Sequence, residues 1–128
     1  MQPIQLFALA SRQAEWLSVR QEVVATNIAN ANTPKFRAKD VSPFDAVLDD
    51  TQVRLARTHP GHLGESQFSR DIAVKETELA DEIGIQESGN TVALADELTK
   101  TGEIKKQYEL STGLVKTFHS MMLMTVRR

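Results

Sequence analysis

Three histidines come nearest to a metal-binding pattern in this chain. His59 and His62 flank a Pro60-Gly61 pair that favours a turn, and His119 lies far along the sequence. A zinc site needs three or four histidine, cysteine or carboxylate ligands. The chain contains no cysteine, and no carboxylate cluster lies beside the histidine pair. We therefore expect no bound metal and no cofactor, and we interpret the turn as a loop that docks on a neighbouring molecule.

Hydroxyl and thioether side chains give no stronger sign of catalysis. A serine nucleophile needs a histidine base and an acidic group that orients it, and the sequence supports no such arrangement around Ser11, Ser18, Ser111 or Thr117. Met121, Met122 and Met124 resemble a soft-metal cluster, but at helical spacing they are more simply adaptable packing residues. We expect the chain not to be an enzyme. A small hydrolase that uses His59 or His62 is the least supported function.

Basic residues alternate around one aromatic ring in the segment Lys35, Phe36, Arg37 and Lys39. Such a pattern occurs in nucleic-acid-binding strands, but it is weak support on a chain of net charge −2. We expect no nucleic-acid partner. The longest apolar run is far shorter than the roughly 20 residues of a membrane span, so we expect no direct membrane insertion. The N-terminus also lacks the basic and apolar regions of a cleaved secretory signal.

Length and composition limit the size of the core. A chain of 128 residues suffices for one modest domain, but 41% apolar and 5% aromatic residues do not predict a large self-contained core. Three parts are expected within this one domain: an N-terminal helix with an Asn-rich, Thr-Pro end (1–34), a middle segment (35–89) and a C-terminal helix (90–128).

Residues 4–31 are expected to form one long amphipathic helix. Pro3 suits a first helical turn, and Pro34 forces Thr33 out of helical geometry. Apolar residues recur at spacings of three and four: Phe7, Ala10, Ala14, Leu17, Val24, Ile28 and Ala31.

Three asparagines lie at the end of this helix: Asn27, Asn30 and Asn32. Asparagine is a mediocre residue inside a helix, because its side chain competes for nearby backbone groups. A cap would need only one of the three. We therefore expect their amides to have fixed partners across a packed contact, since a buried amide must be hydrogen-bonded.

The middle segment is expected to be a small irregular or β-containing insert, mobile in an isolated subunit. Gln52–Arg57 alternates like a short strand, and Ile72–Val74 is a weaker strand candidate. Asp45–Leu48 is expected to form a helical turn. Turn residues interrupt these elements, so they cannot bury much surface.

Residues 91–126 are expected to form a second long helix, capped by Asn90. Its main apolar stripe is Leu94, Leu98, Thr101, Ile104, Tyr108, Ser111, Val115, Phe118 and Met122, and a second stripe is Leu110, Leu114 and Met121. Two stripes are too wide for one partner helix, so we expect contacts beyond the first helix. Gly102 and Gly113 each cost about 1 kcal/mol relative to alanine, which makes the isolated helix marginal. The fold class is therefore mainly α, with two long terminal amphipathic helices packed as a coiled-coil-like pair.

The run Leu17–Pro34, which ends in Asn-Ile-Ala-Asn-Ala-Asn-Thr-Pro, resembles the N-terminal signature of bacterial flagellar rod, hook and hook-associated axial proteins. Three further segments narrow the resemblance to proximal-rod members of the flagella basal body rod protein family. They are Arg37–Val41, Ala56–Leu63 and Gly89–Val92. This family usually has Gly-Tyr where this chain has Lys35-Phe36. Glycine adopts a positive φ more readily than lysine, so the turn after Pro34 is where a difference in shape is expected.

The resemblance implies a structural subunit of the proximal rod, part of the axial drive shaft that transmits torque and encloses the export channel for motility. It implies export through the flagellar type III apparatus without a cleaved signal, and a place in the periplasmic rod of the basal body. The implied partners are other flagellar rod proteins, further copies of the chain itself, proteins at the junction of the MS ring and the rod, and the export apparatus.

Assembly is expected to use the Asn-rich helix end and the apolar stripes. The candidate interface residues are Leu17, Val24, Asn27, Ile28, Asn30, Asn32, Thr33, Pro34, Leu98, Ile104, Tyr108, Leu114, Val115, Phe118 and Met122. A small helical coiled-coil adaptor or secretion chaperone is the alternative function. A chaperone is expected to form a stable dimer, whereas a rod subunit is expected to be partly unfolded alone and ordered on polymerising.

Overall fold

A computed structural model describes residues 3–49, 72–77 and 87–126 of the chain. Within these residues the elements, in chain order, are α1 (Pro3–Ala29), β1 (Lys39–Val41), α2 (Phe44–Asp49), β2 (Val74–Glu76) and α3 (Leu94–Val126). The predicted strand Gln52–Arg57, together with His59 and His62, lies outside the described residues. No described helix is both long enough and apolar enough to span a membrane.

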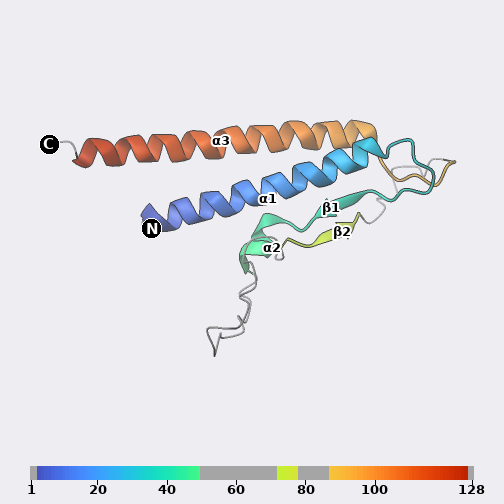
Figure 1. The fold of residues 1–128 in the computed structure, drawn as a ribbon, viewed down its shortest axis with the longest axis horizontal. Helices are drawn as coiled ribbons and strands as arrows, with labels where there is room; N and C mark the ends of the chain where they lie inside the picture. Colours follow the sequence, from blue (N-terminus) through green and yellow to red (C-terminus); the bar gives the residue numbers. More distant parts are fainter. Residues whose placement is uncertain (1–2, 50–71, 78–86, 127–128) are drawn as a thin grey trace, which may run out of the picture.

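The two long helices run antiparallel and side by side (Figure 1). Near the chain termini the rings of Phe7 and Phe118 meet edge to face, with their centroids 6.0 Å apart. At the other end of the pair the side chain of Asn27 reaches Glu97. The prediction of a mainly helical fold, with paired terminal helices and a small β-containing middle, is confirmed.

The helix boundaries differ slightly from those expected. α1 ends at Ala29 rather than near residue 31, and the chain leaves it through turns in which the N–H of Thr33 donates to the carbonyl oxygen of Asn30. α3 begins at Leu94 rather than at residue 91. The first carbonyl oxygen that it uses belongs to Ala93, which accepts from the N–H groups of Asp96 and Glu97.

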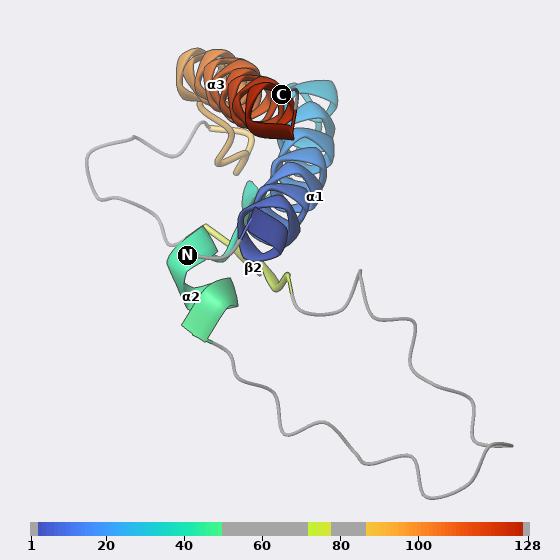
Figure 2. The same cartoon turned by 90° about the vertical axis from the view of Figure 1, so that its left-hand side faces the viewer.

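A short antiparallel ribbon lies along α1 (Figures 1 and 2). β1 pairs with β2 in the register Lys39↔Glu76 and Val41↔Val74. β1 was not predicted, and β2 begins two residues beyond the start of the expected strand Ile72–Val74. The helical turn predicted at Asp45–Leu48 is confirmed within α2.

The core lies where α1 meets both α3 and this ribbon. Its buried cluster is Trp16, Leu17, Val24, Val41, Val47 and Ile104. The indole N–H of Trp16 donates to the carbonyl oxygen of Ser42 (2.8 Å), and its ring packs against Phe44. The core is small, as the scarcity of aromatic residues predicted.

Candidate assembly site

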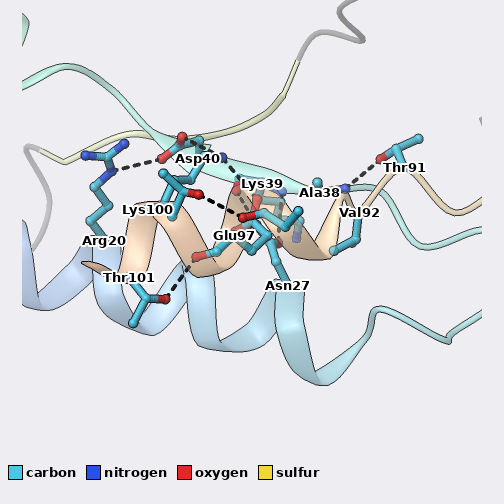
Figure 3. Close-up of polar contacts among 12 residues, drawn as sticks. Arg20, Asn27, Ala38, Lys39, Asp40, Thr91, Val92, Glu97, Lys100 and Thr101 are labelled. Atoms are coloured by element: carbon cyan, nitrogen blue, oxygen red, sulfur yellow. Dashed lines mark hydrogen bonds and ion pairs between the residues drawn. The ribbon is translucent and has the colours of Figure 1, made fainter. Parts of the chain in front are cut away.

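Asn27 joins three segments of the chain through one buried amide (Figure 3). Its Nδ2 donates to the carbonyl oxygen of Lys39 (2.7 Å) and to Oε2 of Glu97 (3.1 Å). Its Oδ1 accepts from the N–H of Lys39 (3.0 Å). The amide therefore completes the backbone of β1 as a neighbouring strand would, while it also holds the first turn of α3.

A charged cluster continues from this amide toward the surface (Figure 3). The carboxylate of Glu97, only 2% exposed, accepts from Lys100 (3.0 Å). Lys100 also pairs with Asp40 (3.2 Å), and Asp40 lies 3.5 Å from Nε of Arg20. Burial lowers the pKa of Lys100, but its bonds to Glu97 and the charge of Asp40 outweigh burial, so the pKa is raised above its ordinary value. The ammonium group is therefore the stable form beside two carboxylates.

Asn90 closes the other end of the Asn-rich segment. It is 1% exposed, and its Nδ2 lies 2.8–2.9 Å from the carbonyl oxygens of Asn30, Ala31 and Thr33. Its Oδ1 accepts from the N–H of Val92 (2.7 Å). The expected role of Asn90 as the cap of α3 is wrong, because α3 begins four residues later. Its amide instead donates to carbonyl oxygens of the turn that follows α1.

The turn after Pro34 keeps a glycine-like backbone although it contains lysine. Lys35 has a φ of 60°, in the left-handed region that glycine adopts at least cost. Its N–H donates to the carbonyl oxygen of Ser88 (2.9 Å), which fixes this conformation. Gly89 faces it with a φ of 74°. Lys35 therefore adopts a positive φ that glycine would adopt at less cost.

The structure distributes the predicted interface residues over three environments. The side chains buried inside the single chain are Leu17, Val24, Asn27 and Ile104. Partly buried are Ile28, Asn30, Val115, Phe118 and Met122, and exposed are Asn32, Thr33, Pro34, Leu98, Tyr108 and Leu114. The buried side chains already have partners within the chain. The surface available to another molecule therefore consists of the exposed residues and the accessible parts of the partly buried ones.

The three predicted amides behave differently. Asn27 has partners across a packed contact, as described above. Asn30 donates to the carbonyl oxygen of Thr26 in its own helix (2.8 Å) and accepts from the hydroxyl of Thr33 (3.1 Å). Asn32 is exposed. The spacing of the three asparagines could not show which of them is buried, because that depends on where β1 lies.

α3 has more exposed apolar side chains than the predicted interface residues include. The large apolar side chains that are about half exposed or more include Leu94, Leu98, Tyr108, Leu110, Leu114, Met121, Leu123, Met124 and Val126. Leu110 is 72% exposed and Met124 is 70% exposed. Exposed apolar surface on this scale marks a contact site. The second stripe in the sequence had indicated Leu110 and Met121, but the candidate set omitted them.

A groove of about 410 Å³ lies between the two helices. Leu17 and Ile104 form its buried floor. The small side chains of Ala14 and Ser18 lie on its α1 side, and its other lining residues are Gln21, Thr101, Lys105 and Tyr108. An apolar floor with a polar rim is the usual composition of a protein–protein interface.

The described part of the chain contains few groupings of titratable side chains. Among the residues that the structure describes, no group of three His, Cys, Asp or Glu side chains could hold a metal ion. His119 lies exposed on α3. Lys100, Asp40 and Glu97 neutralise one another in ion pairs, so this cluster holds elements together.

Comparison with known proteins, like the exposed apolar surface of α3, indicates a protein that assembles with others. The flagella basal body rod protein family matches residues 9–37, which contain most of α1 and the Asn-rich turn. A flagellar basal body rod protein FlgB of Agrobacterium fabrum is 72% identical over 100% of this chain and 97% of its own length. FlgB of Escherichia coli K12 is 33% identical over 72% of the chain and 71% of its own length. FlgB of Borrelia hermsii is 30% identical, over 83% and 84% respectively.

Proposed function

The chain belongs to the flagella basal body rod protein family, and we propose that its place is in the proximal rod of the bacterial flagellum. Membership makes it a structural subunit of the flagellar basal body rod. The proximal position is the finer statement, and it is supported by a relative named FlgB that matches the whole length of the chain. The family's role is structural, and we propose that the chain has no enzymatic activity.

The observation that carries the proposal is the apolar surface of α3 that α1 leaves uncovered. Leu110, Leu114 and Met121 are each more than half exposed in the single chain. Leaving a Leu side chain in water costs roughly 1.5–3 kcal/mol relative to burying it. A rod subunit recovers this free energy when its neighbours cover the helix, whereas an isolated protein would not.

The paired helices are suited to a load-bearing and channel-forming role. An α-helix rises 1.5 Å per residue, so the 33 residues of α3 make a rod of roughly 50 Å. The proposal is that α1 and α3 of successive subunits line the export channel and transmit torque along the axial drive shaft. The contacts proposed are with copies of the chain, with other rod proteins and with proteins at the junction of the MS ring and the rod.

Export is the other part of the proposal. The chain is proposed to reach the periplasmic rod through the flagellar type III apparatus, without a cleaved signal peptide. The mass of the chain recovered from purified basal bodies tests this directly. The full translated mass is expected, and a shortened N-terminus would contradict export without cleavage.

The proposed position is tested by deleting the gene and examining the basal bodies by electron microscopy. Cells without the chain are expected to form rings but no complete rod, hook or filament, and not to swim. Restoring the gene should restore all three structures. A complete rod in the deletion strain would contradict the proposal. A stable soluble dimer, found apart from basal bodies, would instead support the adaptor or chaperone alternative.

A further inference from the structure

One side of the C-terminal half of α3 forms a second helical stripe, which we name the outer stripe. Its residues are Leu110, Gly113, Leu114, Thr117, Met121 and Met124, at the three-and-four spacing of a packed helix face. All six are exposed. Figures 1 and 2 show α1 as the only described element that lies along this half of α3.

The outer stripe points away from the groove between α1 and α3. A helix turns about 100° per residue, so Leu110 and Leu114 point roughly 120° and 80° to one side of Ile104. By the same count Lys105 points roughly 100° to the other side, and it lines the groove with Thr101 and Tyr108. The outer stripe, which is convex, and the groove, which is concave, therefore lie on opposite sides of α3 in one molecule.

The two faces complement each other in shape and chemistry. Leu110, Leu114, Met121 and Met124 form a ridge of long side chains in this stripe. Gly113 adds no side chain to the ridge, and a Cβ built there would meet no atom within 4 Å. The groove has a floor of Leu17 and Ile104, and Ala14 and Ser18 keep its α1 side low. Helices bind grooves of this kind through apolar anchors spaced four residues apart, as Leu110 and Leu114 are.

We propose that the outer stripe of one copy of this chain seats in the α1–α3 groove of a second copy. The inference rests on the proposed function, because a rod subunit must contact further subunits. A two-fold contact would place stripe against stripe and leave both grooves empty. Stripe in groove is a heterologous contact instead, and contacts of this type continue from copy to copy as a helical polymer requires.

Disulfide trapping tests the pairing in assembled rods, because the native chain has no cysteine background. The double variant Ser18→Cys/Leu114→Cys would replace the native chain in cells, and basal bodies would be purified and oxidised. A disulfide forms only when the two Cβ atoms come within about 4.5 Å. We expect dimers and higher multimers of the chain on a non-reducing gel. A second pair, Ala14→Cys/Leu110→Cys, serves if the first variant fails to assemble.

Single variants identify the type of contact. Ser18→Cys alone and Leu114→Cys alone should give no dimer, and equal mixing of the two in one cell should restore it. A dimer from Leu114→Cys alone would show a two-fold contact and overturn the proposal. A cross-link within one chain, seen as a faster-migrating monomer, would show that the stripe folds onto its own groove and would also overturn it.

The outcomes separate this inference from the function on which it rests. If swimming cells contain the cysteine variants in their basal bodies and no pair cross-links copies of the chain, the groove does not receive a second copy, while the rod function stands. If the native chain itself is absent from purified basal bodies, the proposed function fails as well.

Discussion

At the scale of single residues, Asn27 links three elements of the described fold through one buried amide. It pairs with both backbone groups of Lys39 and with the carboxylate of Glu97, and it is 1% exposed. A buried amide of this kind is worth more for what its removal leaves unpaired than for the bonds themselves. The sequence indicated an amide with a fixed partner, and at Asn27 that partner is within the chain.

Asn27→Leu should lower the free energy of unfolding by about 2–3 kcal/mol, because it removes the partner of both part-buried backbone groups of Lys39 and leaves the buried carboxylate of Glu97 with Lys100 alone. Chemical denaturation of the full chain, followed by circular dichroism, measures the change. Asn32→Leu is the matched control, since Asn32 is exposed and its replacement should change the free energy by about 0.5 kcal/mol or less. Equal effects of the two substitutions would show that the Asn27 contacts do not stabilise the fold.

Lys100 gives the polar cluster a pH dependence at the alkaline end. Its pKa in the folded chain is raised above the ordinary 10.5, so the stability it contributes is complete below pH 10.5 and is lost as the pH rises through the folded value. Denaturation between pH 7 and 12 should show an alkaline fall that is smaller in Lys100→Gln than in the native chain. The exposed Lys106→Gln is the control and should keep the native profile. Identical profiles for all three chains would contradict the ion-paired cluster.

At the scale of elements, the long helices were predictable and the ribbon was not. Apolar residues repeat every three or four positions along both helices, and this local signal predicted α1 and α3 to within about three residues at each end. β1 and β2 contain three residues each and pair across more than 30 positions of sequence. Strands this short carry no alternation to recognise, and β1 is held by the amide of Asn27, which bonds the backbone of Lys39 twelve residues away.

The assembly site could likewise be predicted only in part, because local patterns do not show how distant elements contact one another. Periodicity indicated the stripes on α3, but it could not show which residues α1 covers, because that depends on how the two helices are rotated about their axes. Ile104 is 3% exposed while Leu98, in the same predicted stripe, is 58% exposed. The cluster of Arg20, Asp40 and Lys100 was missed, since its members come from three separate elements.

Two glycines allow a prediction about α3 and the turn that precedes it. Gly102→Ala should stabilise the isolated chain by about 1 kcal/mol, because alanine is the better helix former and its Cβ meets no atom within 4 Å. Gly89→Ala should destabilise it, because Gly89 has a φ of 74°. Thermal unfolding followed by circular dichroism at 222 nm compares the two. A loss of stability in Gly102→Ala would indicate that another part of the chain approaches α3 at this position.

At the scale of the whole molecule, the described residues cover only part of the apolar surface of the two long helices. α1 covers one face of α3, and the ribbon covers a second face of α1. The other sides of α3 remain exposed, with Leu110 at 72% and Leu98 at 58%. The small core stabilises the pair, while the uncovered faces favour association with further subunits. Both properties suit a rod subunit that becomes fully ordered when it polymerises.

The accessibility of one outer-stripe residue tests this account most directly. Leu114→Cys places a single thiol on a helix face that is 57% exposed at this position in the lone chain. Maleimide labelling would be compared between the isolated variant and basal bodies that contain it, with denatured basal bodies as the measure of complete labelling. If neighbouring subunits cover α3, the thiol should label rapidly in the isolated chain and be strongly protected in the intact rod. Equally rapid labelling in both would contradict burial of α3 on assembly.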